Sequence, residues 1–163
     1  MDRTLITDDF IPIEGIVQAG VNDCNEVWGL ALEARHFLEQ LQDLFPHILQ
    51  GWLFAGFAHL GVFLFEVTAS SGSTQFVWVV AGDVPPAFIE ARFKTGLGAL
   101  KVYVRFMREW VEAVRAGKPV DDLIPVCFRG TIRPAPQTLE TAEQLSGRLD
   151  YIEQEVIPAW SNR

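Results

Sequence analysis

Three side chains near the middle of the chain have the residue types that acid–base chemistry requires. Asp83 stands where an apolar run ends and a proline turn begins, a place from which side chains often reach into a cleft. Glu66 interrupts an apolar alternation, and a carboxylate inside a sheet costs free energy unless it is paired or protonated. His59 is close to Glu66 in sequence, and histidine is the commonest general base. The sequence therefore nominates His59, Glu66 and Asp83 as candidate catalytic residues.

Each of these residues also has a purely structural explanation. Asp83 can accept N–H groups of its own turn, or cap a helical turn that opens at Pro85 or Pro86. Glu66 can face solvent, and His59 can bond to a backbone carbonyl. The structural explanation is favoured by the sequence, and a large separation between His59 and Glu66 would exclude a site that they share.

No metal or cofactor is expected. Glu33 and His36 are three residues apart, which is half of a di-iron helix motif, but the second copy that such a site needs is missing from the sequence. The other histidines add no zinc signature. Cys24 and Cys127 lie far apart without a Cys-x-x-Cys pair, so a disulfide framework is not encoded either.

A row of cations offers one further candidate for ligand binding. Lys101, Arg105 and Arg108 share one face of a predicted helix and have the charge to hold an anion. Spacings of four residues, however, pair Arg105 with Glu109 and Arg108 with Glu112. We therefore expect a salt-bridged, solvated helix face there.

Three amphipathic helices must position these side chains. Apolar residues recur at steps of three and four residues in three stretches, each followed by glycine or proline. The predicted helices span about 23–45, 98–116 and 138–157. Asp23 is the expected start of the first helix, and Pro158 the expected stop of the third.

Two runs of β-branched and aromatic residues predict a hairpin, with strands at about 61–69 and 74–82. Both faces of these strands are apolar, as in a sheet that is covered on two sides or shared in a dimer. Further strands are predicted at 52–59 and 126–132. The expected fold is α+β: an antiparallel sheet with this central hairpin, packed against three helices. We expect residues 1–163 to form one domain, with 1–20 as an extended arm.

One segment of this hairpin resembles a known motif. The Trp78-bearing strand runs into Gly82-Asp83-Val84-Pro85 and then into Phe88-Ile89. It is similar to a family of small bacterial proteins of unknown function, in which a tryptophan strand leads into Gly-Asp-Leu-Pro; Val84 stands here in place of the leucine. The resemblance covers about a quarter of the chain. It implies a bacterial α+β protein with a fixed corner between strand and turn, and it implies no activity.

Composition excludes several classes of function. The 163 residues are 49% hydrophobic, so the chain can fold around a core, and 13 basic against 21 acidic residues give a net charge of -8. An acidic chain is a poor binder of nucleic acid or of anionic membranes. No basic stretch followed by an apolar run marks a signal peptide, and no apolar run is long enough to span a bilayer. We therefore expect a cytoplasmic protein.

The aromatic residues point toward association. Five tryptophans and twelve phenylalanines are more than a small core readily encloses, and aromatics at the edge of a helix stripe often anchor interfaces. Trp28, Trp160 and the outward-facing His36 are the candidate interface residues. A second copy of the chain or another protein is the expected partner.

These observations favour a non-enzymatic, acidic protein-interaction module, such as an inhibitor or an immunity-like factor. The alternative is a small enzyme or a binder of a small apolar ligand, with a cleft at the strand ends near His59, Glu66 and Asp83. A bound protein favours the first function, and a bound small molecule favours the second.

Overall fold

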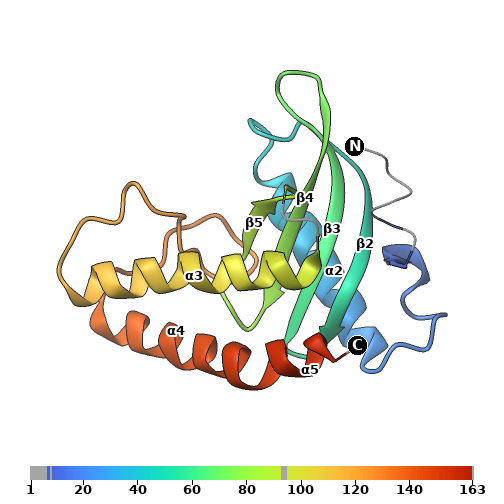
Figure 1. The fold of residues 1–163 in the computed structure, drawn as a ribbon. Coiled ribbons are helices and arrows are strands. Elements are labelled where there is room, and N and C mark those ends of the chain that lie inside the picture. Colours follow the sequence, from blue (N-terminus) through green and yellow to red (C-terminus); the bar gives the residue numbers. More distant parts are fainter. Residues whose placement is uncertain (1–6, 8, 93–94, 163) are drawn as a thin grey trace.

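The computed structural model describes residues 7, 9–92 and 95–162. A five-stranded antiparallel sheet in the order β1-β2-β3-β4-β5 lies between helix α2 on one face and helix α3 on the other, and α4 runs beside α3 (Figure 1). The elements are β1 (Ile11–Pro12), α2 (Cys24–Glu39), β2 (His47–Phe57), β3 (Leu60–Thr68), β4 (Thr74–Gly82), β5 (Ala87–Glu90), α3 (Gly96–Arg115), α4 (Leu139–Tyr151) and α5 (Ile157–Ser161). The predicted α+β fold, with an antiparallel sheet against three principal helices, is confirmed.

The predicted hairpin forms the centre of the sheet. β3 and β4 pair without a shift from Leu60 opposite Gly82 to Thr68 opposite Thr74. The expected strand at 52–59 is also present, within the longer β2. The prediction of a strand at 126–132 is wrong. Gly130 has a positive φ of 70° and turns the chain, so that this segment forms only a single bridge, between Cys127 and Pro134.

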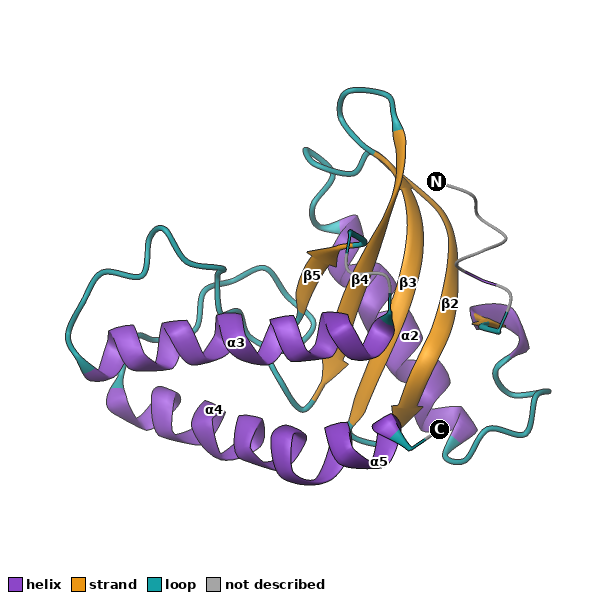
Figure 2. Ribbon diagram, viewed as in Figure 1, coloured by secondary structure: helices purple, strands orange, loops and turns teal. Residues whose placement is uncertain are grey.

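Both faces of the sheet are covered, as the two-sided apolar pattern predicts (Figure 2). Leu64 and Trp78 point toward α3 and α4, where they join a core that includes Tyr103. Phe63 and Val79 point to the opposite side and pack in the core around α2. The alternation of strand side chains therefore builds two separate cores on one sheet.

Three helix ends differ from the prediction. Helix α2 ends at Glu39 and not near residue 45, because the chain turns over residues 40–44, where the N–H groups of Leu41 and Leu44 donate to carbonyls only three residues earlier. Helix α2 begins after Asp23, but the Asp23 side chain does not cap it; its Oδ2 atom accepts a hydrogen bond from the N–H of Ala58 at 3.2 Å. The last helix does not stop at Pro158. It passes through a π-helical turn (Ile152–Val156) into α5, where Pro158 lies in the first turn, a position that needs no N–H donor.

Part of the expected N-terminal arm docks on the sheet. Ile11 and Pro12 pair with β2, and the Phe10 ring makes edge-to-face contacts with Phe54 and Trp78, with ring centroids 5.9 and 5.7 Å away. Residues 1–6 and 8 of this arm lie outside the described residues. Among the helices described, none is long and apolar enough to cross a membrane.

Candidate functional site

The end of β4 and the turn between β2 and β3 meet at a corner that depends on Gly82. Gly82 has a φ of 133°, and a Cβ atom at this position would collide with the backbone carbonyl of His59. Because glycine permits this close approach, the N–H of Asp83 donates to the carbonyl oxygen of His59 at 2.8 Å. The two side chains then leave the backbone next to each other.

His59 and Asp83 are joined directly. Nδ1 of His59 lies 2.8 Å from Oδ2 of Asp83, and 68% of the His59 side chain is exposed. With Nδ1 engaged, Nε2 is the ring nitrogen left for another group, and it has no partner among the described residues. The register of the hairpin explains this contact. Leu60 pairs with Gly82 at the end of the β3–β4 ladder, so the residues just beyond that pair, His59 and Asp83, lie next to each other.

Two more side chains extend this contact into a network. Oδ1 of Asp83 accepts from Nη1 of Arg129, and Arg129 also binds the Glu33 carboxylate through Nη2 at 2.9 Å and Nε at 3.1 Å. The hydrogen bond to Glu33 is the main reason that the pKa of Arg129 is raised. We call His59, Asp83, Arg129 and Glu33 the corner network.

Glu66 does not belong to this network. It is half-buried near the far end of β3, opposite Gln50 of β2. Glu66 is seven positions from His59, and six of these steps lie within the extended β3, which corresponds to roughly 20 Å. A site that His59, Glu66 and Asp83 share is therefore excluded.

The sequence pairs Glu33 with His36 as half of a di-iron motif. In the structure the Glu33 carboxylate binds Arg129, whereas Nδ1 of His36 lies 3.9 Å from the carboxylate of Glu39. Arg129 had no distinguishing signal in the sequence, since 96 positions separate it from Glu33.

A groove runs from the corner network along α4, and its two halves share Asp83, Val84, Gln144 and Arg148. The half beside His59 measures about 420 Å³ and the half beside Arg129 about 560 Å³. We call the whole depression the corner groove. The guanidinium of Arg148 makes no hydrogen bond or ion pair with any residue that the structure describes.

The wall behind the corner is rigidly held. Tyr103 of α3 is fully buried, and its hydroxyl donates to the carbonyl oxygen of Pro85 at 2.6 Å. Burial raises the pKa of Tyr103 far above its ordinary value, so the hydroxyl stays protonated and keeps donating. This bond fixes the turn that follows Asp83.

A second concave feature follows the free edge of β5. We call it the edge cleft: a largely apolar hollow of about 520 Å³. β5 lines it, Phe37 of α2 and Leu41 of the turn after α2 form one wall, and Phe106 of α3 with Ile124 and Ile132 of the following loop form the other. Its volume falls within the range of ordinary ligand pockets.

The backbone of β5 presents hydrogen-bonding groups to this cleft. The N–H of Ala91 donates to Phe76, and in an antiparallel pair the bonding direction alternates, so Ala87 and Ile89 face β4. The N–H and C=O groups of Phe88 and Glu90 therefore point away from β4. They make no hydrogen bond with another described residue.

The loop between α3 and α4 contributes to both concave features. Cys127 lines the edge cleft and also the groove half that contains Arg129. Burial raises the pKa of the Cys127 thiol, which disfavours the reactive thiolate. Two contacts hold this loop: Arg129 binds Glu33 of α2, and Gln40, which follows the last residue of α2, donates to the carbonyl oxygen of Gly130 at 2.9 Å.

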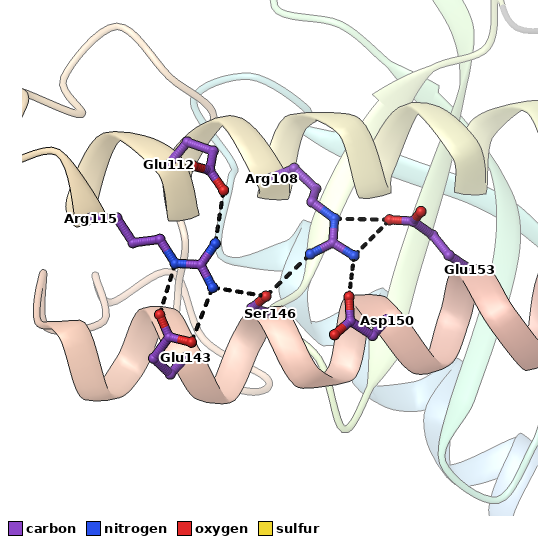
Figure 3. A network of polar contacts seen from close by, with 7 residues as sticks. All are labelled: Arg108, Glu112, Arg115, Glu143, Ser146, Asp150 and Glu153. Atoms are coloured by element: carbon purple, nitrogen blue, oxygen red, sulfur yellow. Dashed lines mark hydrogen bonds and ion pairs between the residues drawn. The ribbon is translucent and has the colours of Figure 1, made fainter.

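The cations of α3 form a separate network with α4 (Figure 3). Arg108 binds Asp150 at 2.6 Å and Glu153 at 2.8 Å, and not Glu112 as its spacing predicts. Glu112 pairs with Arg115 instead, which also binds Glu143 at 2.7 and 3.0 Å. The neighbouring helix supplies partners that the α3 sequence alone does not contain. This α3–α4 network consists of Arg108, Glu112, Arg115, Glu143, Ser146, Asp150 and Glu153.

The three interface candidates separate into two groups. Trp28 and His36 lie on the outer face of α2 with exposed Leu32 between them, at spacings of four residues. Trp160 is only 9% exposed and contacts the rings of Phe54 and Phe57. It is a core residue, because the π-helical turn carries the chain end back against β2.

Comparisons of the chain with family models, curated proteins and solved structures found no match. The resemblance of the Gly82-Asp83 segment to a bacterial family therefore stays a prediction. What the structure adds is a physical role for that segment: it builds the corner at which His59 and Asp83 meet.

Proposed function

We propose that the protein is a non-enzymatic interaction module that binds an extended, apolar segment of another protein in the edge cleft. The observation that carries this proposal is the position of β5, a free sheet edge that lines an apolar hollow of about 520 Å³. An extended chain can extend the sheet by one strand and place alternate side chains against α2 and α3.

The hydrogen-bonding groups of β5 favour a polypeptide over a small apolar molecule. The outward N–H and C=O groups of Phe88 and Glu90 repeat at the two-residue interval of a strand. Only a chain with the same repeat satisfies both pairs. An apolar molecule would cover them and leave buried polar groups unbonded, which is costly.

The walls of the cleft favour a single strand over a second copy of this chain. Leu41 on one side and Phe106 on the other line the hollow together with β5. A second copy would have to pair its own β5 with this one while its own α2 and α3 stand on either side of that strand, and these helices would meet the walls of the cleft. An isolated segment carries no such helices. The net charge of -8 further favours a segment with basic residues around its apolar part.

Two matched substitutions test this proposal. Ile132 lines the cleft and Leu139 lies outside its lining, and both side chains are exposed, 42% and 61% respectively. Peptides of about eight residues selected from a random library should bind the unaltered protein. Ile132→Asp should weaken the binding by roughly tenfold or more, because it places a carboxylate against an apolar segment. Leu139→Asp should not change it.

Two local measurements locate the bound peptide. Binding should slow hydrogen exchange at the amides of Phe88 and Glu90, and should protect Cys127 from alkylation in a Cys24→Ser background. The proposal would be contradicted by selected peptides that bind the Ile132→Asp variant with unchanged affinity, or that leave the amides of Phe88 and Glu90 unprotected. So would a mass excess of a few hundred daltons in native mass spectrometry that Ile132→Asp removes, since it would show that the cleft holds a small molecule.

A further inference from the structure

The corner groove contains two groups that can donate to an anion and that no described residue uses. One is the guanidinium of Arg148, exposed on α4. The other is Nε2 of His59, which the contact between Nδ1 and Asp83 leaves for another partner. Both side chains line the same hollow of about 420 Å³. A guanidinium and an imidazolium are the groups with which proteins bind carboxylates and phosphates.

The carboxylates around the groove place the anionic head on the His59 side. Among the described residues that line this half, Asp83 is the one carboxylate, and its two oxygen atoms already bind His59 and Arg129. The other half also contains Glu140, whose charge would repel an anion. The favourable position is therefore between His59 and Arg148.

The rest of the hollow suits an apolar body. Leu60, Val84 and Ile152 are buried and contribute apolar surface to the hollow, and Phe57 and Tyr151 line it with aromatic rings. A purely ionic ligand would leave this surface unused. A flat apolar group attached to the anionic head would cover it, and burial of that group adds to the affinity.

We propose that the corner groove is a second binding site, independent of the edge cleft, for a small molecule with a carboxylate or phosphate head on a flat apolar body. Arg148 and His59 hold the head, and Asp83 orients the imidazole through Nδ1. Donation from both ring nitrogens requires the protonated imidazole, so the anion binds together with a proton on His59.

Two probe anions and one neutral analogue test the proposal. Phenyl phosphate, benzoate and benzyl alcohol are titrated into ¹⁵N-labelled protein at a mildly acidic pH, because the proposed contact needs the protonated imidazole. One or both anions should give saturable shifts at the amides of His59, Val84 and residues 144–152, and benzyl alcohol should not. A response to benzoate or to phenyl phosphate alone identifies the head group. Absence of saturation with either anion would overturn the proposal, as would equal binding of the alcohol.

Three variants then assign the contacts. Arg148→Gln should weaken anion binding about tenfold or more, whereas Lys101→Gln, an equal charge change on the outer face of α3, should leave it unchanged. His59→Asn keeps an amide donor near Asp83 but removes Nε2, and should weaken binding to a similar degree. Thermal melting shows whether each variant is folded. A folded Arg148→Gln or His59→Asn variant with unaltered affinity would overturn the assignment.

Discussion

The corner network and the α3–α4 network are both built on arginines that bind carboxylates from neighbouring elements, yet they differ in how they end. In the α3–α4 network, both arginines bind carboxylates and converge on Ser146, which is 8% exposed and accepts from each of them at 3.2 Å (Figure 3). The arginine side chains there are only 28% and 33% exposed.

The corner network instead ends at His59, whose Nε2 atom has no hydrogen-bond partner among the described residues. Arg129 is 48% exposed, and His59, which lines the groove, is 68% exposed. Similar ion pairs therefore serve two purposes. A closed network joins two helices, whereas an open one holds a side chain in a fixed orientation for something outside the chain. The presence of charged residues does not distinguish the two; the presence of an unused donor does.

The largest effect is expected from a substitution that breaks the corner itself. Gly82→Ala forces a Cβ atom into the carbonyl of His59 at a positive φ, and should lower the free energy of unfolding by about 3 kcal/mol. Gly72→Ala is the matched control, because Gly72 also has a positive φ but open space around it. It should cost only about 1 kcal/mol. Urea unfolding measures both, and equal losses would mean that the corner contact is unimportant.

The corner also shows what local sequence patterns can and cannot predict. The hairpin follows from alternating residues on either side of a short turn, and its register brings His59 to Asp83 across 24 positions. The three main helices follow from their apolar periodicity in the same way. Neither β1 nor β5 was predicted, since strands of 2 and 4 residues next to prolines carry no period, and only the neighbouring strands make them strands.

The long-range partners were beyond prediction for a related reason. The contact between Arg129 and Glu33, like that between Arg108 and Asp150, depends on how loops and helices are placed after the sheet has formed. The spacing within α3 suggested a pair from Arg108 to Glu112, but an adjacent helix offered better geometry. Charged side chains have many competing partners, and one-dimensional spacing does not select among them.

The same substitution in each network provides a smaller but sharper comparison. Arg108→Met should lower the free energy of unfolding by roughly 1 kcal/mol, because it removes two carboxylate contacts from a partly buried helix seam. Arg129→Met should lower it by about 0.5 kcal/mol, since the Arg129 side chain is itself more exposed than that of Arg108, 48% against 28%. Arg129→Met should, however, speed hydrogen exchange in residues 126–135. Equal stability losses without this local change would mean that the corner network is only a second structural clamp.

The smallest expected effect concerns how the stabilisation by the α3–α4 network depends on pH. Arg115 lowers the pKa of Glu143 through its hydrogen bond, so the folded state holds this carboxylate ionised at pH values where the unfolded chain protonates it. The stabilisation is therefore complete above the ordinary glutamate pKa of about 4.3 and is lost as the pH falls through the lower value in the folded protein. Glu143→Gln should make the melting temperature fall less steeply between about pH 5 and pH 3. Glu109→Gln removes a carboxylate on α3 that has no ion pair with a described residue, so the melting temperature of this variant should fall as steeply as that of the unaltered protein. If the melting temperature falls equally steeply in both variants, Glu143 does not contribute to acid stability, and the α3–α4 network is weaker than its geometry indicates.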